Sequence, residues 1–155
     1  MIKIIAHTNT QPLFQQILRT DASKSKIIIR VMVGGVFLSE GIQKFLFPDE
    51  LGAGRFQKMG LPNPEFFGSF VGTFEIICGT LILLGLFTRL ATIPLLVIMF
   101  VALATTKAEI LTEKGFWEMM HASRTDWTML LGNLFLLLNG GGKWSLDKIL
   151  LKNGA

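Results

Sequence analysis

The sequence predicts an all-α integral membrane protein whose four helices form a bundle in the bilayer. Three observations predict this fold class: half of the 155 residues are hydrophobic, only 17% are charged, and the mean hydropathy is +0.52. Soluble domains carry about 25% charged residues, so this chain is too apolar for a soluble domain of its size. We therefore expect one membrane domain.

Charge and cysteine content exclude several classes of protein. Fifteen Lys and Arg residues against eleven Asp and Glu residues give a net charge of +4. These charges lie between the apolar stretches and form no stripe that would bind nucleic acid. The single cysteine excludes an intramolecular disulfide and a Cys-rich zinc or iron–sulfur centre. Because the common nucleotide-binding and zinc-protease motifs are missing as well, we expect no metal site and no autonomous redox centre.

The four predicted spans are apolar stretches long enough to cross a bilayer, which takes about 20 helical residues for a core about 30 Å thick. They cover residues 27–47, 66–87, 90–106 and 121–138, and the last ends at a glycine-rich helix stop. The second and third spans are so close that they must form an antiparallel hairpin. We expect a transmembrane domain over residues 27–150, preceded by a cytoplasmic or interfacial segment, 1–26, and followed by a tail, 151–155.

The distribution of basic residues predicts the orientation in the membrane. Four spans place both termini on the same side, and nine Lys and Arg residues lie on that side against six on the other. The positive-inside rule therefore predicts that both termini are cytoplasmic. The first 25 residues do not resemble a signal peptide. Apolar residues around positions 13–18 instead predict a segment on the membrane surface, with Lys24 and Lys26 at anionic headgroups.

Ionisable residues inside the spans are the first candidates for a functional site. Each costs about 2.5 to 3.5 kcal/mol to insert and usually faces the protein interior or water. Glu40 and Lys44 are spaced i, i+4 in the first span with the acid first, which suits either a structural ion pair or a functional one. Glu75 has no basic neighbour in the second span, so its carboxyl group must be protonated or bridged to another helix. Both states suit proton or quinol chemistry.

A second group of candidates lies where the third span ends and the fourth begins. Lys107 ends the third span, Arg124 and Asp126 begin the fourth, and His121 lies on the same rim. We expect the acids and bases of all four helices to converge here and to form a polar pocket that opens outward. Asp126 and Arg124 also fit a simple helix N-terminal charge and an interface anchor.

Other residues in the spans have a structural explanation. Arg30 and Arg89 lie at the inner ends, where snorkelling to the headgroups accounts for them. Gly68, Gly72 and Gly79 thin the second span and favour close packing against another helix. These glycines also leave a homo-oligomer open.

Seven short motifs together identify a family resemblance. They are Arg30 with Gly35-Val-Phe-Leu-Ser-Glu-Gly-Ile-Gln-Lys-Phe45, Met59-Gly-Leu-Pro62, Glu75 with Gly79, Gly85-Leu-Phe-Thr-Arg89, Gly115-Phe-Trp117, Arg124-Thr-Asp126 and Gly142-Lys-Trp-Ser-Leu-Asp147. With these motifs the sequence resembles the DoxX family of small four-helix membrane proteins, over nearly all of the chain from Arg30 to Leu150. The resemblance implies a bacterial inner-membrane protein. Some relatives are subunits of thiosulfate:quinone oxidoreductase or of membrane complexes that handle thiol and superoxide stress.

Two functions of different classes remain open. In the first, the protein is a subunit or accessory of a membrane redox complex, binds a quinone and receives electrons from a partner protein. The catalytic candidates are then Glu75, Glu40 and Asp126, and the ligand-binding candidates are Lys44, Arg124, His121 and Lys107. In the second, the protein is a non-enzymatic membrane adaptor or assembly factor whose outer loops hold a partner. Transport of small solutes is disfavoured because no paired broken helices or repeats are found.

Overall fold

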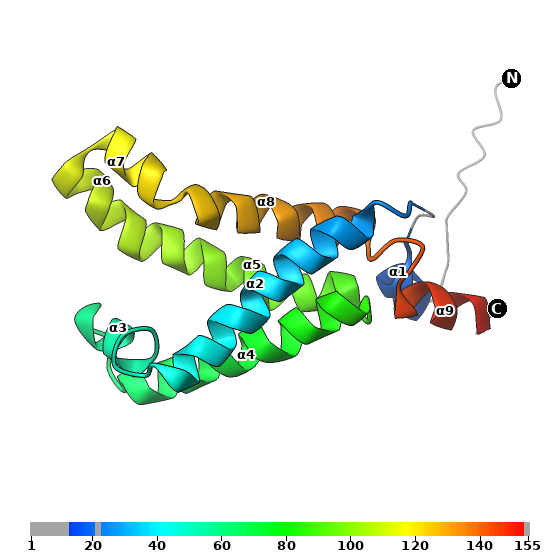
Figure 1. The fold of residues 1–155 in the computed structure, drawn as a ribbon, viewed down its shortest axis with the longest axis horizontal. Helices are drawn as coiled ribbons and strands as arrows, with labels where there is room; N and C mark the ends of the chain where they lie inside the picture. Colours follow the sequence, from blue (N-terminus) through cyan, green and yellow to red (C-terminus); the bar gives the residue numbers. More distant parts are fainter. Residues whose placement is uncertain (1–12, 21–22, 154–155) are drawn as a thin grey trace, which may run out of the picture.

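A computed structural model describes residues 13–20 and 23–153, and these ranges form helices and no strands, which agrees with the predicted all-α class (Figure 1). The elements are α1 (Leu13–Leu18), α2 (Lys26–Leu46), α3 (Ala53–Lys58), α4 (Pro64–Leu84), α5 (Thr88–Ala102), the π-helix η1 (Leu103–Lys107), α6 (Ala108–Lys114), α7 (Phe116–Ala122), α8 (Arg124–Asn139) and α9 (Leu146–Asn153). Residues 1–12, including His7, lie outside the described ranges.

Each predicted span contains a long helix, but only two of the described helices are both long enough and apolar enough to cross a membrane. These are Pro64–Leu84 and the continuous helix Thr88–Lys114, which joins α5, η1 and α6. The α2 helix has 21 residues but carries four charged side chains, and α8 has only 16 residues. Length and composition alone therefore support two of the four predicted spans.

The third span is longer than predicted because the helix continues past residue 106. A π-helical turn, η1, lies between α5 and α6, and the chain then reverses at Gly115, whose φ of 87° is in the region that favours glycine. The α7 helix follows at once and leads through Ser123 into α8. Residues 107–122 thus form a helical extension of the α5–α8 pair.

Helices α2 and α4 pack so closely that their glycines are required. A Cβ atom on Gly41 would lie 2.7 Å from the carbonyl oxygen of Gly72, and one on Gly79 would lie 2.7 Å from the backbone nitrogen of Leu38. Real Cβ atoms do not approach backbone atoms this closely, so only glycine permits this helix separation. The predicted packing role of the glycines in the second span is confirmed, and the helix that they contact belongs to the same chain.

The core lies between the α2–α4 pair and the α5–α8 pair. A Cβ atom on Gly132 of α8 would lie 2.6 Å from a methyl group of Val33, which shows how closely α8 crosses α2. The buried apolar side chains are Val33, Phe37, Cys78, Ile82, Ala91, Leu95, Met99, Met129 and Leu136. In Figure 1 the two pairs lie together near α1 and α9, which we call the α9 end, and diverge toward α3 and the α6–α7 turn, which we call the α3 end.

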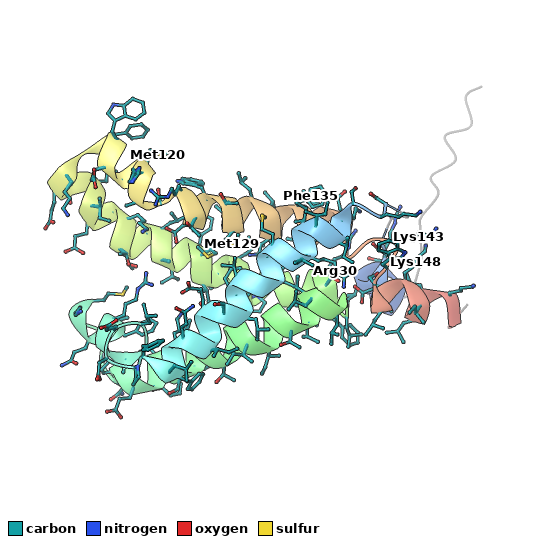
Figure 2. All side chains as sticks on the ribbon, viewed as in Figure 1. Arg30, Met120, Met129, Phe135, Lys143 and Lys148 are labelled. Carbon is teal, nitrogen blue, oxygen red and sulfur yellow. The ribbon has the colours of Figure 1, made fainter. Side chains whose placement is uncertain are left out.

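The prediction that Arg30 extends to headgroups is wrong, because its side chain is only 3% exposed. The Nε atom donates to the carbonyl oxygen of Ile82 at 2.9 Å, and Nη1 donates to that of Trp144 at 2.6 Å. The guanidinium also donates to the carbonyl groups of Leu83 and Gly141. Arg30 therefore joins the end of α4, whose last carbonyls have no partner within the helix, to the segment before α9 (Figure 2).

Asp147 attaches α9 to the other side of the α4–α5 turn, at the start of α5. Its two carboxylate oxygens accept hydrogen bonds from the backbone N–H groups of Phe87 and Thr88, at 2.6 and 3.0 Å. Burial raises the pKa of this carboxyl group above its ordinary value, and the hydrogen bonds from Thr88 and Phe87 oppose that effect. The α9 end is thus closed by polar contacts that hold the C-terminal helix against the α4–α5 turn.

Candidate functional site

The strongest candidate site is a buried ion pair between Lys44 of α2 and Glu75 of α4. The Nζ atom of Lys44 lies 2.7 Å from Oε2 of Glu75. The two residues are 7% and 4% exposed. Of the two states predicted for Glu75, the structure shows the bridge to another helix. A charged pair removed from water on two apolar helices is costly to maintain, and such pairs within membrane helices often mark function.

The glycine contacts explain how this pair forms. The Cβ atom of Lys44 packs beside Gly72, where an added Cβ would lie 3.3 Å away. Glu75 follows Gly72 by three residues, about one helical turn, so it lies on the same side of α4. Because α2 and α4 approach at glycine separation, the Lys44 side chain can reach the Glu75 carboxylate without leaving the interface.

Glu40 is the third member of this group but a weaker partner of Lys44. Its Oε2 atom lies 3.9 Å from the Nζ atom of Lys44, and its side chain is 45% exposed. The ion pair predicted within α2 is present at this longer distance, and the Lys44 ammonium is closer to Glu75 on the neighbouring helix. Two carboxylates therefore share one ammonium, one of them buried and one partly open.

The remaining candidates form a second group on the other helix pair. Lys107, the last residue of η1, lies 3.1 Å from Oδ2 of Asp126 and donates to the carbonyl oxygen of Ala122 at 2.9 Å. Asp126 thus pairs with the third predicted span. Short π-helical segments inside α-helices are frequent at functional sites, and here the π turn ends on the lysine of the pair.

Arg124 and His121 lie together on the surface next to this second pair. Nη1 of Arg124 lies 2.6 Å from Nε2 of His121, and both side chains are exposed. Among the residues that the structure describes, no hydrogen bond or ion pair links the Lys107–Asp126 pair to the Lys44–Glu75 pair. Both pairs lie toward the α3 end, where the two helix pairs diverge in Figure 1. The predicted pocket that would unite all these residues therefore stays a prediction, because the two groups lie on helix pairs that separate at this end.

Comparison with known proteins now supplies the family. The sequence model of the DoxX family matches residues 25–108, more than half of the chain. The chain belongs to the DoxX family. It is 51% identical over 147 residues to "Uncharacterized membrane protein Rv3486" of Mycobacterium tuberculosis, covering 91% of this chain and 90% of the relative. It is 26% identical over 127 residues to "Putative oxidoreductase CatD" of Bacillus subtilis, covering 81% of this chain and 87% of that protein. No solved structure matches the chain.

The family match covers the Lys44–Glu75 pair and ends just past Lys107, so Asp126 and His121 of this DoxX protein lie outside it. Glu40, Lys44, Glu75 and Lys107 all fall between residues 25 and 108. The matched region thus includes both residues of the buried pair on α2 and α4.

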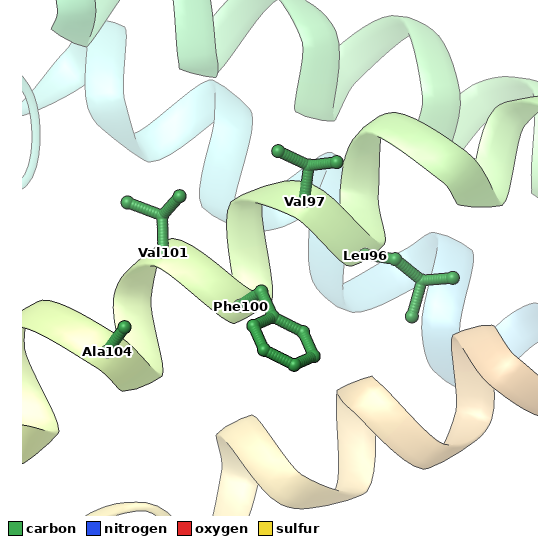
Figure 3. Close-up of a pocket in the computed structure, with 5 residues that line it drawn as sticks. All are labelled: Leu96, Val97, Phe100, Val101 and Ala104. Carbon is green, nitrogen blue, oxygen red and sulfur yellow. The ribbon is translucent and has the colours of Figure 1, made fainter.

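A hollow on the surface of this DoxX protein is lined by none of the residues of the two charged groups. It has a volume of about 310 Å³ and is lined by Leu96, Val97, Phe100, Val101 and Ala104 (Figure 3). All five side chains are apolar and come from α5 and η1, on the face of the helix opposite Leu95 and Met99 of the core. Such a face suits acyl chains and lacks the convergent polar groups of a ligand site.

Sequence reasoning missed one part of the polar architecture of this DoxX protein. Arg30 and Asp147 make buried contacts at the α9 end. Finding these contacts from the sequence would require knowing that the tail folds back onto the α4–α5 turn.

Proposed function

We propose that this DoxX protein is a multi-pass inner-membrane subunit or accessory of a redox complex and binds a quinone headgroup at Lys44, Glu75 and Glu40. The observation that carries the proposal is the buried 2.7 Å contact between Lys44 and Glu75. In proton-coupled quinone chemistry, the cation of such a pair can stabilise the charge on a quinone oxygen, and the acid can transfer a proton. The name of the Bacillus subtilis relative, which includes the word oxidoreductase, supports a redox role.

Each residue of the group has a distinct task in this proposal. The Lys44 ammonium donates a hydrogen bond to a carbonyl oxygen of the quinone and stabilises the negative charge that develops on reduction. Reduction of a quinone to a quinol takes up two electrons and two protons, and Glu75, once protonated, would give one of these protons to the bound headgroup and take up another from Glu40 or water. Glu40 is partly exposed and near Lys44, so it connects the buried acid with the surroundings. A partner protein supplies or accepts the electrons.

The membrane arrangement that accompanies this proposal uses α2, α4, α5 with η1 and α6, and α8 as four spans. Both termini are then cytoplasmic, and the α9 end faces the cytoplasm. Exposed basic residues at that end support this orientation; they are Lys24, Lys143, Lys148 and Lys152. The Lys107–Asp126 pair, with His121 and Arg124 beside it, lies toward the opposite side and closes the α5–α8 pair there.

The proposal is tested by measuring the quinone that co-purifies with the full chain in mild detergent, by solvent extraction and mass spectrometry. We expect the wild-type protein to retain quinone and Glu75→Gln to retain at least about tenfold less, because a hydrogen bond to a charged group contributes about 1.5 to 3 kcal/mol. Glu113→Gln removes an exposed acid of α6 and should retain as much quinone as the wild type.

A second variant separates loss of binding from loss of fold. Glu75→Gln leaves the buried Lys44 ammonium without its partner, which can itself destabilise the protein. The double variant Lys44→Met with Glu75→Met removes both charges together and should keep the melting temperature while losing the quinone. A wild-type protein without any bound quinone, or a double variant that keeps its quinone, would contradict the proposal.

One observation favours the adaptor alternative. Phe116 and Trp117 stack edge to face at the α6–α7 turn, with ring centroids 5.2 Å apart, and Trp117 is 82% exposed. Exposed aromatic side chains are frequent anchors in protein interfaces. Under this alternative, Phe116→Ser with Trp117→Ser lowers the apparent mass of the complex in gently solubilised membranes, while the wild-type protein carries no quinone.

A further inference from the structure

The α9 end of the molecule presents positive charge to its surroundings. Three lysines there have exposed side chains, and we call them the basic face: Lys24 before α2, Lys143 before α9, and Lys148 in α9. Among the residues that the structure describes, none of these three side chains makes a hydrogen bond or an ion pair. The acid of the same segment, Asp147, is only 1% exposed, and its carboxylate already accepts from backbone N–H groups of the α4–α5 turn. The basic face therefore has no described acid to balance it.

The exposed charges at the opposite end of the molecule are mixed. Lys114 of α6 lies in the chain between Glu113 and Glu118, and all three side chains are exposed. Lys58 of α3 is exposed in the same connecting segment as Glu50, which is exposed as well. An excess of positive charge is thus a property of the α9 end, and it indicates a negatively charged partner there.

Backbone contacts hold the basic face beside the α4–α5 turn. In the proposed arrangement this turn lies where α4 and α5 leave the membrane, and both helices meet the length and composition criteria for a span. The N–H group of Asp147 donates to the carbonyl oxygen of Gly85 in the turn at 2.9 Å, and that of Lys143 donates to the carbonyl oxygen of Ser23 at 3.0 Å. Phospholipid headgroups fill a layer of about 5 to 7 Å on each side of the hydrocarbon core. Lys143 and Lys148, which lie at this end of the bundle in Figure 2, are therefore placed at the level of lipid phosphates.

The α9 helix (Leu146–Asn153) offers apolar side chains as well as basic ones. Leu146, Ile149 and Leu150 are exposed. At 3.6 residues per turn they share a sector of about 100°, and Lys148 lies outside it. Trp144, directly before the helix, is 59% exposed. Separate basic and apolar sides are typical of helices that contact a lipid surface, and tryptophan is enriched at that surface. A free anion would use the charges alone, so this combination favours a phospholipid.

We propose that the basic face, Lys24, Lys143 and Lys148, binds the phosphate groups of anionic phospholipids at the membrane surface. This inference uses from the proposed function only that α4 and α5 cross the membrane, and quinone binding plays no part in it. Lys26, which the sequence places at headgroups, does not belong to the face, because its side chain is 4% exposed and its Nζ atom donates to the carbonyl oxygen of Asn139 at 2.8 Å. The bound phosphates supply the negative charge that the described chain lacks at this end.

The experiment compares two lipids that differ in headgroup charge. Dioleoylphosphatidylglycerol is anionic, and dioleoylphosphatidylcholine has the same acyl chains with a neutral headgroup. Both are added at equal concentration to the purified full chain in detergent, and native mass spectrometry measures the lipid that each protein retains. We expect the wild type to retain at least about tenfold more of the anionic lipid, because the attraction adds up over several basic residues.

Paired substitutions locate the lipid on the surface. Lys143→Gln with Lys148→Gln should lose most of the preference, and Lys143→Arg with Lys148→Arg should keep it because the charges remain. Lys58→Gln with Lys114→Gln is the matched control, since it removes the same charge from the other end and should behave like the wild type. All four lysines are exposed, so the variants should share the wild-type melting temperature in detergent without added lipid.

Three results would overturn this proposal. The first is equal retention of both lipids by the wild type. The second is an equal loss of preference in the two Lys→Gln double variants, which would reflect the net charge of the chain and no particular surface. The third is binding of inorganic phosphate or of a polyglutamate peptide as tight as that of phosphatidylglycerol, which would assign the face to small anions or acidic proteins. Quinone extracted from the same samples should be unchanged, so a failure here is distinct from a failure of the quinone site.

Discussion

At the scale of single residues, Arg30 and Lys44 show two ways in which α2 accommodates a buried cation. Lys44 pairs with an acid on the neighbouring helix. Arg30 binds backbone carbonyls instead, at the end of α4 and in the segment before α9. Carbonyls at a helix C-terminus have no partner within the helix and carry partial negative charge, so a guanidinium satisfies them without any acid nearby.

The first prediction concerns Arg30. Arg30→Met removes the guanidinium donor from the carbonyl groups of Ile82 and Trp144, of which that of Ile82 keeps the N–H of Gly85. We expect the variant to be destabilised by about 3 kcal/mol or more, because several charge-assisted hydrogen bonds are lost at once. Thermal unfolding of the protein in detergent measures this. Lys24→Met, which removes an exposed cation at the same end, should leave the melting temperature unchanged, and an equal effect of both variants would show that Arg30 acts only through net charge.

Sequence reasoning identified most residues of the candidate site but not their partners. Intramembrane charge is visible in the sequence, so Glu40, Lys44 and Glu75 could be named directly. Their pairing could not, because the spacing of Glu40 and Lys44 suggests a contact within α2, whereas the short contact crosses to α4. Whether Lys44 is closer to Glu40 or to Glu75 depends on the distance between α2 and α4, which is short because glycines lie in their interface.

At the scale of elements, the α2–α4 contact determines the geometry of the ion pair. Glycines from both helices lie in this interface, including Gly41 and Gly72. Gly35, in contrast, would have no atom within 4 Å of an added Cβ. Neighbouring glycines of one helix therefore have different roles, some in the interface and one outside it.

The second prediction uses this contrast. Gly41→Ala places a methyl group 2.7 Å from the carbonyl oxygen of Gly72, so the helices must separate and the protein should lose stability. Gly35→Ala gains the same helix propensity, about 1 kcal/mol, without a clash and should be neutral or slightly stabilising. A higher melting temperature for Gly35→Ala than for Gly41→Ala is expected. Equal tolerance of the two substitutions would argue against close packing of α2 on α4.

Helix positions were predictable from hydropathy, but the extension of the α5–α8 pair was not. Residues 107–120 contain several charged side chains and no apolar stretch, so no helix is expected there from hydropathy. In the structure the helix continues through η1 into α6 and returns as α7. The π turn depends on one extra residue per turn and leaves no clear mark in composition, although it positions Lys107 beside Asp126.

At the scale of the whole molecule, the structure consists of two helix pairs that are joined near α9 and diverge toward α3 (Figure 1). The ion pairs lie toward the diverging end, and the Arg30 and Asp147 contacts lie at the joined end. The all-α class followed from composition alone. Which helices cross the membrane did not, because charge in α2 and the short length of α8 leave only two described helices that meet the criteria for a span.

The third prediction tests the orientation. In a Cys78→Ala background, which removes the single cysteine, we introduce Lys148→Cys at the α9 end or Glu113→Cys on α6. If four helices cross the membrane, a membrane-impermeant maleimide should label Glu113→Cys from the outside of intact cells and Lys148→Cys only in inverted vesicles. Labelling of both positions from the same side would exclude this topology.

The position of Arg30 in the chain has a consequence for biosynthesis. Trp144, whose carbonyl group it binds, lies 114 positions further along, so the ribosome delivers this partner long after α2 has been made. Until then the guanidinium of the nascent helix is incompletely satisfied and depends on water or lipid phosphates. Final assembly at this end must therefore wait until residue 144 has been made, and a message truncated shortly before codon 141 would yield a protein without the carbonyl groups of Gly141 and Trp144 that Arg30 binds.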